Sequence, residues 1–177
     1  RWVAIGGEDF TVRGGSSAGL VHRKGGQGGF VEDMAREFRI PMINLIDGTG
    51  ANVASAIKSK FKRFPAKDGY ERCLQLLGLV PVVSAVLGAA AGGPAGRAVM
   101  SHFSVMVRGT SQLFAAGPPV VERALSKKIT KEELGGAHIA VDKAGSIDNA
   151  VDSEEEAFVQ IKRFLSYMPQ NVWEMPP

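Results

Sequence analysis

The stretch Gly88–Met100 combines small residues with a helix signal, a combination from which a backbone binding site can be built. It follows an apolar run, Leu79–Leu87, typical of a buried strand, and leads into helical spacing of apolar residues over Ala95–Phe103. Glycine lets a ligand approach the main chain, and a helix start adds free N–H donors and a positive dipole end. Gly92 and Gly93 are therefore candidates for holding an oxygen that develops negative charge. A small-residue turn is also a common packing device, so the pattern alone leaves both interpretations open.

A second strand and turn of the same kind occur earlier in the chain. The run Ile40–Asp47 predicts a buried strand, and the small residues of 47–52 follow it. Strands that alternate with helices imply an α/β fold. Ligands usually bind at the carboxyl ends of the strands in such a sheet, so we expect the turns near Gly50, Gly93 and Gly117 to gather on one face.

The remaining patterns predict the elements that position these turns. Helices are predicted over Phe30–Phe38, Gly69–Leu77, Val120–Leu125 and Ser153–Tyr167, and short strands over Asp9–Val12, Phe103–Val107 and Ser111–Ala115. Thr130 and Glu133 form a capping-box signature. Gly78 reads as a helix C-cap, and His102 as a cap for the last carbonyls of the Ala95–Phe103 helix.

Composition excludes several classes of protein. Hydrophobic residues make up 45% and charged residues 22% of the 177 positions, which indicates a globular domain rather than a disordered chain. The net charge of +3 suits an anionic ligand but does not indicate a nucleic-acid partner. The single cysteine, Cys73, excludes an internal disulfide and argues against a zinc site. No apolar run is long enough to cross a membrane, so we expect a cytoplasmic protein, or a mitochondrial-matrix one in a eukaryote.

Side chains suited to acid–base or nucleophilic catalysis are scarce. None of the three histidines has metal-ligand spacing, no Gly-x-Ser-x-Gly elbow occurs, and Asp47 is the one carboxylate at a strand end. Asp47 can equally bond its own turn. Lys58 and Lys60 belong to a basic cluster that reads either as a solvated helix face or as a pad for ligand phosphates. A site made of main-chain N–H donors fits this inventory best.

Seven segments resemble the N-terminal half of the carboxyltransferase component of biotin-dependent acyl-CoA carboxylases. That component belongs to the crotonase-like superfamily. In chain order they are Asp9–Ser16, Asp47–Ala51, Val80–Gly88, Ala91–Gly93, Phe114–Pro118, Thr130–Ala137 and Phe164–Pro169. The Glu-Glu-Leu-Gly-Gly-Ala segment is specific to these carboxyltransferases, whereas Ala-Gly-Gly is generic for the superfamily. The resemblance implies a crotonase-like ββα superhelix over residues 1–177, which we expect to be part of a longer chain.

The resemblance also implies a reaction and its partners. Carboxybiotin, charged by a separate biotin carboxylase and carried by a biotin carrier domain, delivers carbon dioxide to the α-carbon of an acyl-CoA. The backbone N–H groups of Ala51 and Gly93 would form the oxyanion hole for the thioester enolate, with Gly50 and Gly92 making room. Further substrate contacts are implied at Asn52, Gly117, Pro118, Lys58 and Lys60. A C-terminal carboxyltransferase domain and a homo-oligomeric assembly are implied as well, with neither nucleic acid nor membrane as a partner.

Departures from the family pattern keep alternatives open. Asn52 replaces the usual Arg, and Ala89-Ala90 replaces Pro-Cys, so acyl preference and the contacts with CoA are left open. Enoyl-CoA hydratases and isomerases of the same fold carry carboxylates where this chain has Gly96 and Pro119, which argues against hydration. An acyl-CoA decarboxylase and a non-catalytic CoA-binding or assembly module remain as further alternatives. We expect residues 1–177 alone to be inactive, and the role of the His22–Gly29 loop stays open.

Overall fold

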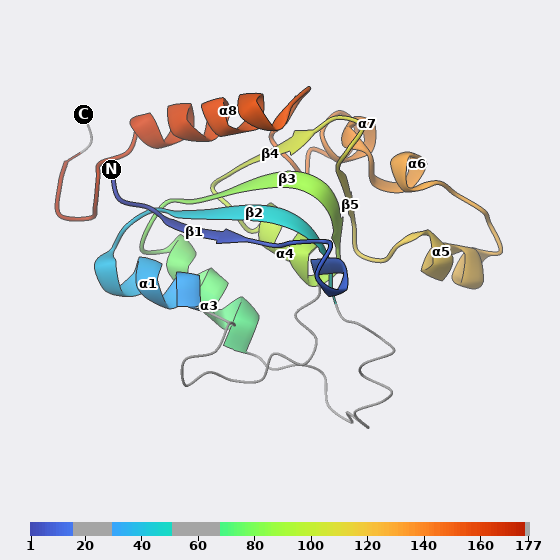
Figure 1. Cartoon of the computed structure of the whole chain (residues 1–177), viewed down its shortest axis with the longest axis horizontal. Coiled ribbons are helices and arrows are strands. Elements are labelled where there is room, and N and C mark those ends of the chain that lie inside the picture. Colours follow the sequence, from blue (N-terminus) through green and yellow to red (C-terminus); the bar gives the residue numbers. More distant parts are fainter. Residues whose placement is uncertain (16–29, 51–67, 176–177) are drawn as a thin grey trace.

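A parallel β-sheet organises the chain. The structure, a computed structural model, describes residues 1–15, 30–50 and 68–175. Within these ranges six strands form one sheet: β1 (Ala4–Gly7), β2 (Met42–Thr49), β3 (Val82–Ala91), β4 (Phe103–Val107), β5 (Gln112–Phe114) and β6 (Asn149–Val151). The order is β1-β2-β3-β4-β6, β5 pairs with the end of β3, and each of these pairings is parallel. Their carboxyl ends therefore share one edge of the sheet (Figure 1).

Helices cover the two faces of the sheet. Helix α8 (Glu154–Ser166) lies on one face and contacts β3 and β4 (Figure 1). Helices α1 (Phe30–Phe38), α3 (Asp68–Leu77) and α4 (Gly93–Val99) lie on the other face. The shorter elements are η1 (Arg13–Gly15), α5 (Pro118–Leu125), α6 (Lys131–Gly135) and α7 (Ala137–Ala140). The sheet thus has helices on both sides, as expected for an α/β protein.

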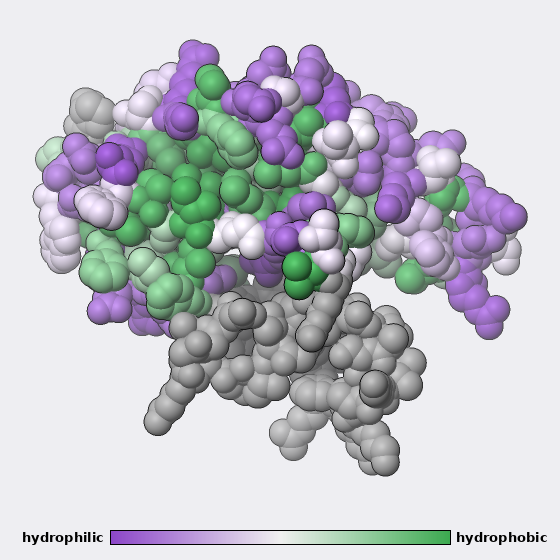
Figure 2. All heavy atoms as spheres, in the orientation of Figure 1, coloured by the Kyte–Doolittle hydropathy of each residue, from purple (hydrophilic) through white to green (hydrophobic). Residues whose placement is uncertain are grey.

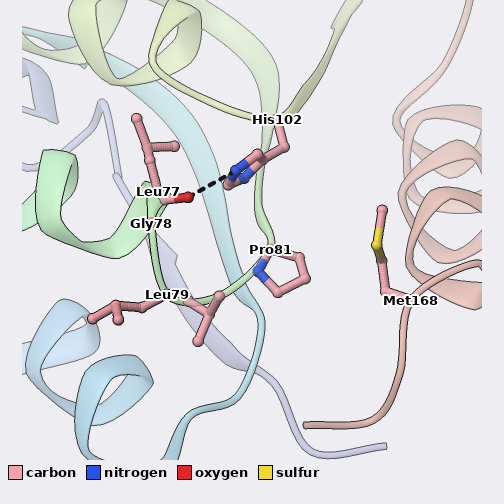
Figure 3. A pocket seen from close by; sticks show the side chains of 7 residues that line it. Leu77, Gly78, Leu79, Pro81, His102 and Met168 are labelled. Carbon is pink, nitrogen blue, oxygen red and sulfur yellow. Dashed lines mark hydrogen bonds between the residues drawn. The ribbon is translucent and has the colours of Figure 1, made fainter. Parts of the chain in front are cut away.

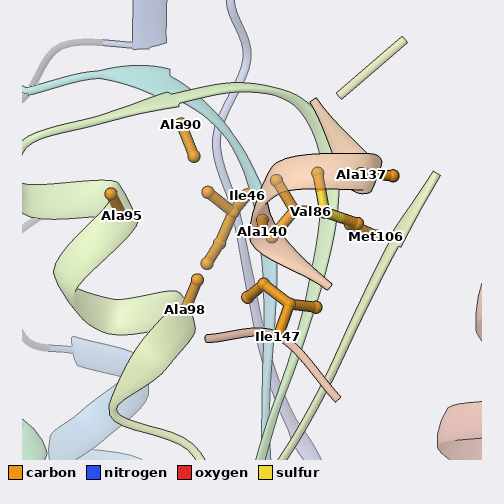
Figure 4. Packing of buried hydrophobic residues seen from close by; sticks show 9 residues of the cluster. All are labelled: Ile46, Val86, Ala90, Ala95, Ala98, Met106, Ala137, Ala140 and Ile147. Carbon is orange, nitrogen blue, oxygen red and sulfur yellow. The ribbon is translucent and has the colours of Figure 1, made fainter. Parts of the chain in front are cut away.

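Small side chains let α4 pack closely against the sheet. Ala95 and Ala98 of α4 face Ala90 of β3, and all three are buried. Figure 4 shows the cluster that they complete, with Ile46, Val86, Met106, Ala137, Ala140 and Ile147. Since protein interiors pack at nearly crystalline density, the size of these residues sets the distance between helix and sheet. The cluster therefore determines where the start of α4 lies relative to β2 and β3.

Helix α8 builds the core on the opposite face. Ala157, Ile161 and Leu165 are buried against strand residues such as Val83 and Val105. Ser153 begins the helix by accepting a hydrogen bond from the Glu156 N–H at 3.2 Å. The amphipathic pattern of Ser153–Tyr167 is thus confirmed as a helix of almost the predicted length.

Most predicted elements are present, but one predicted strand is absent and one predicted helix has different bounds. The segment Asp9–Val12 is a turn rather than a strand, because the Asp9 carboxylate accepts from the Thr11 N–H at 2.9 Å and the Asp9 carbonyl accepts from Val12. The first strand is β1, which precedes it. Helix α4 ends at Val99, and Phe103 begins β4. Gly78 does follow the last residue of α3, but its φ is not positive, so it is not a left-handed cap.

His102 also has a different role from the predicted one. It does not cap α4. Its Nδ1 accepts from the Val82 N–H at 3.0 Å, and its Nε2 lies 3.0 Å from the Leu77 carbonyl oxygen, to which it donates. His102 therefore joins the end of α3 to the start of β3 in the tautomer that carries its proton on Nε2.

The molecular surface is mixed in character. Figure 2 shows apolar side chains on the visible face along β1 and β2, between α8 and α1. Ile5, on β1, is 55% exposed there. Across the described ranges, none of the helices combines the length and apolar character needed to cross a membrane. The same ranges contain no group of three or more histidine, cysteine or acidic side chains that could hold a metal ion.

Candidate functional site

Two of the predicted glycine turns meet at the carboxyl edge of the sheet. Gly50 follows β2, and a β-carbon at this position would lie 2.9 Å from the Ala91 carbonyl oxygen and 3.1 Å from the Gly93 nitrogen. Both are backbone atoms that cannot swing aside, so only glycine fits here. Gly92 has φ +65° and ψ −115°, a conformation that side-chain-bearing residues rarely adopt. The two turns are thus in main-chain contact.

The Gly93 N–H is available as a donor. Gly93 is the first residue of α4, where the N–H groups have no partner inside the helix. No hydrogen bond from this N–H to another described residue is found. Pro94 follows it and is tolerated in a first turn because its position needs no donor. The N–H of Gly93 therefore lies at the contact with Gly50 without a partner among the described residues.

The third predicted turn closes the same region. The Gly92 N–H donates to the Phe114 carbonyl oxygen at 3.1 Å, and the Ala115 carbonyl lies 3.7 Å from the β-carbon position of Gly92. Gly117 is the N-cap of α5, and Pro118 is its first residue. The structure therefore brings the ends of β2, β3 and β5 together, whereas Gly117 contacts Phe114 and Pro119 rather than the other two glycine turns.

Asp47 lies next to this region, and its side chain contacts β3 at Gly88 and Ala89. Its carboxylate rests against the Cα of Gly88 and accepts a hydrogen bond from the Ala89 backbone. Desolvation raises the pKa of Asp47, the Ala89 bond opposes that shift, and the charge of Asp9 reinforces it. The side chain thus contacts the neighbouring strand β3, and residues 51 and 52 of its own turn lie outside the described residues.

The site includes residues that sequence patterns did not identify. Glu8, after β1, forms an ion pair with Arg97 of α4, directly beside the two turns. They lie 89 residues apart in the chain, so no local spacing connects them. Of the predicted site residues, Ala51, Asn52, Lys58 and Lys60 lie outside the described residues. Gly50, Gly92, Gly93, Gly117 and Pro118 are described, and the structure brings the three glycines of the first two turns into contact.

A separate pocket lies at the other edge of the sheet. It has a volume of about 260 Å³ and is lined by residues 77–81, His102 and Met168 (Figure 3). These residues precede β3 and β4 or follow α8. Ten residues of β3 separate the pocket from the glycine turns, which is about 30 Å of extended chain. The pocket is therefore not part of the site.

Glycine turns grouped after parallel strands, with helices on both sheet faces, define an α/β domain with a candidate main-chain site at the carboxyl edge of its sheet. The sequence profile of the "Carboxyl transferase domain" matches residues 1–177. The chain belongs to the carboxyl transferase domain family.

Relatives and a solved structure agree with this assignment. The chain is 36% identical over 177 residues to the propionyl-CoA carboxylase carboxyltransferase subunit of Haloferax mediterranei, covering 100% of this chain and 33% of the relative. It is 34% identical over 173 residues to the biotin-dependent acetyl-/propionyl-coenzyme A carboxylase beta5 subunit of Mycobacterium tuberculosis, with 97% and 30% covered.

The solved structure is that of transcarboxylase 12S, described as a hexamer assembly with hydrolysed methylmalonyl-coenzyme A bound. It superposes with a TM-score of 0.77 at 25% identity, over 98% of this chain and 33% of that one. The likeness to a known carboxyltransferase confirms the crotonase-like fold that the sequence predicted. The chain spans about a third of the length of each of these three proteins.

Proposed function

We propose that this chain supplies the acyl-CoA half-site of the carboxyltransferase in a biotin-dependent acyl-CoA carboxylase. One observation carries the proposal: among the described residues nothing accepts from the Gly93 N–H, and Gly50 leaves space beside it where the turns after β2 and β3 touch. A β-carbon at position 50 would fill the space beside the Gly93 nitrogen. The absence of a side chain is what a backbone oxyanion hole requires.

The chemistry then rests on positioning and charge stabilisation. The N–H groups of Gly93 and Ala51 donate to the thioester oxygen of the acyl-CoA, and the bonds strengthen as that oxygen becomes an enolate. Preorganised donors of this kind contribute about 3–4 kcal/mol each to the transition state. Carboxybiotin, when bound, would supply the carbon dioxide that the α-carbon of the enolate attacks, and the biotin left after loss of carbon dioxide would supply the base that takes the α-proton. No described side chain has to act as a nucleophile in this scheme.

Substrate and partners follow from the relatives. Two of them are named as acetyl- or propionyl-CoA carboxylase subunits, and the transcarboxylase structure has hydrolysed methylmalonyl-coenzyme A bound, so a short acyl-CoA is the proposed substrate. A biotin carboxylase, a biotin carrier and a C-terminal carboxyltransferase domain complete the proposed assembly, which is homo-oligomeric like the transcarboxylase hexamer. A chain with one cysteine needs no oxidising compartment, which supports a cytoplasmic or matrix location.

A complex with methylmalonyl-CoA tests the site directly. In a crystal structure of the full-length protein, we expect the thioester oxygen within about 3.2 Å of the nitrogens of Ala51 and Gly93. Gly117 and Pro118 should lie against the ligand. A ligand bound away from both nitrogens contradicts the proposed site, and binding there without carboxylation of propionyl-CoA by the complete assembly favours the non-catalytic module.

The predicted phosphate pad needs its own experiment. Reversing the charge at Lys58 and Lys60 should raise the Kd for methylmalonyl-CoA at least 10-fold, because each cation that faces a phosphate contributes to binding. Lys162, exposed on α8 and on the other sheet face, is the matched control for charge reversal. An unchanged Kd contradicts the phosphate pad and favours the other interpretation, in which the cluster is a solvated helix face.

A hydratase or isomerase remains the weaker enzyme alternative. Gly96 and Pro119 occupy the positions at which those enzymes carry their carboxylates, and neither residue can transfer a proton. Water addition to crotonyl-CoA by the full-length protein would favour this alternative. The proposal predicts no such reaction. Release of carbon dioxide from methylmalonyl-CoA without a biotin acceptor would instead indicate a decarboxylase.

A further inference from the structure

Two charged side chains meet beside the glycine turns and are largely withdrawn from water. Arg97 Nη2 donates to Glu8 Oε1, and the side chains are only 28% and 17% exposed. Burial lowers the pKa of Arg97. A guanidinium nevertheless keeps its charge in proteins, so the arginine needs an anionic partner. The pair is therefore a fixed feature of the folded chain rather than a surface contact.

Arg97 is linked to the second turn, Gly92–Gly93, through helix α4. It lies four residues after Gly93 on α4, and residues at this spacing share one helix face. Helical side chains also tilt towards the helix N-terminus, so the guanidinium reaches back towards the Gly92–Gly93 turn. The Arg97 carbonyl accepts from the Ser101 hydroxyl at 3.0 Å, which anchors the end of the same helix.

Glu8 is linked to the first turn, at Gly50, through strand β2. Its N–H donates to the Leu45 carbonyl oxygen at 3.0 Å, which extends the pairing of β1 with β2. Its carboxylate packs on Gly48, where a β-carbon would lie 2.7 Å from Oε2. Gly48 stands at the register shift of β2, two residues before Gly50. Glu8 therefore contacts the strand that leads directly into the first turn.

The Glu8 carboxylate uses only one of its two oxygens to bond Arg97, and the other oxygen packs against the backbone of β2. An arginine and a carboxylate commonly form two parallel hydrogen bonds. Here Glu8 Oε2 is buried and has no hydrogen-bond partner among the described residues. That oxygen instead rests against the main chain of β2 at Gly48. The carboxylate thus acts as a spacer between β2 and the guanidinium on α4.

We propose that Glu8 and Arg97 are a positioning pair that sets the separation of the Gly50 and Gly93 turns. The inference rests on the proposed function, in which N–H groups of both turns bind one thioester oxygen. Neither side chain contacts that oxygen. Because a catalytic constellation must be held within about 0.5 Å of its productive geometry, loss of the pair acts on the transition state more than on substrate binding.

Kinetics of the full-length protein with its biotin-carrying partner test the pair. With propionyl-CoA as the probe, Arg97→Met and Glu8→Ala should lower kcat by about 10- to 100-fold and change KM less than about threefold. Arg97→Lys and Glu8→Gln keep one hydrogen bond and should recover part of kcat. Ser104→Ala is the matched control, since it removes a buried link to Asp148 between β4 and β6, away from the turns. Its kcat should stay within about twofold at a similar loss of thermal stability.

A crystal structure of Arg97→Met separates this inference from the proposed function. A shift of about 0.5 Å or more between Gly50 and Gly93, relative to the wild type, supports the positioning role even if the wild type carboxylates no acyl-CoA. Unchanged turns in a folded Arg97→Met protein overturn the role, whatever the activity. Equal losses of kcat in Arg97→Met and Ser104→Ala also overturn it, because the effect then follows stability alone.

Discussion

At the scale of single residues, the candidate site depends on glycines, whose lack of a side chain leaves the main chain accessible. Gly50 leaves space for the Gly93 N–H, and Gly92 adopts a positive φ that turns the chain into α4. Asp47 is the charged neighbour, but it bonds the backbone at Ala89. Within the described residues, the Gly93 N–H is therefore the candidate donor of this region.

Gly50→Ala should inactivate the proposed carboxyltransferase. Its β-carbon would lie 2.9 Å from the Ala91 oxygen and 3.1 Å from the Gly93 nitrogen, so the turns must separate. We expect kcat for propionyl-CoA in the full-length enzyme to fall by about 100-fold or more. Gly78→Ala is the matched control, because its β-carbon meets nothing closer than 3.9 Å and its φ is not positive. Full activity of Gly50→Ala rules out the Gly93 N–H as a catalytic donor.

Asp47→Asn should make stability less dependent on pH. Desolvation raises the pKa of Asp47 above its ordinary value of 3.8, so the folded state holds its proton more tightly than the unfolded state. The wild type therefore loses stability as pH rises from 3.8 through the folded-state pKa, and the asparagine variant does not. In urea titrations, the variant should be the more stable protein at pH 7, and the difference should shrink towards pH 4.

Asp142→Asn, at an exposed carboxylate after α7, is the control for the loss of one negative charge. A stability difference between the wild type and Asp47→Asn that is constant from pH 4 to pH 7 contradicts the assigned cause, because it would reflect a packing change instead.

At the scale of elements, short helices are held by specific polar contacts more than by length. Helix α6 has five residues and begins with a complete capping box, in which Thr130 and Glu133 exchange hydrogen bonds. These bonds lower the pKa of Glu133, so their contribution is present above pH 4.5 and is lost as pH falls through the folded-state value. Helix α5, in contrast, has no buried residue.

Thr130→Ala should destabilise the protein by about 1 kcal/mol, because the Glu133 N–H loses its acceptor at the start of α6. Thr110→Ala, in the exposed turn between β4 and β5, is the control and should change the free energy of unfolding by less than about 0.5 kcal/mol. Urea titration at pH 7 measures both. Equal stability of Thr130→Ala and the wild type would mean that packing alone holds α6.

At the scale of the whole molecule, the candidate site and the pocket of Figure 3 lie at opposite edges of the sheet. The glycine turns lie at the carboxyl ends of β2, β3 and β5, whereas His102 and the pocket of Figure 3 lie at the amino ends of β3 and β4. The direction of parallel strands makes this separation unavoidable, because consecutive strands start at one edge and end at the other. Substitutions at the two edges should therefore have different consequences.

His102→Ala should lower stability without changing catalysis. It removes the acceptor of the Val82 N–H and the donor to the Leu77 carbonyl, which should cost about 1 kcal/mol. The KM and kcat for propionyl-CoA should stay within about twofold of the wild type, since the residue lies at the opposite edge from the turns. His138→Ala, exposed on α7, is the control for stability. A large change in kcat for a folded His102→Ala protein contradicts the separation of the two edges.

Local patterns in the sequence determined much of this protein. Apolar periodicity located α1, α3 and α8, the capping box located α6, and small residues after apolar runs located the turns at Gly50, Gly93 and Gly117. These features depend on neighbours within a few residues, which is why they can be read from spacing. The family also followed from segment motifs, and the profile match confirmed it.

Only the tertiary structure decided which distant residues meet. Asp9–Val12 has strand-like composition, yet the Asp9 side chain bonds Thr11 and turns the chain. His102 bonds Val82, 20 residues away, and Arg97 reaches Glu8 across 89 residues. The contact of Gly50 with Gly93 likewise requires β2 and β3 to pair in one register and α4 to pack on small residues. The sequence alone marked the Gly92–Gly93 turn as a candidate donor site, and the packing of the sheet placed it against Gly50. Hydrogen bonds and burial between remote segments produce no periodic pattern in the chain, so this contact could not be predicted from spacing.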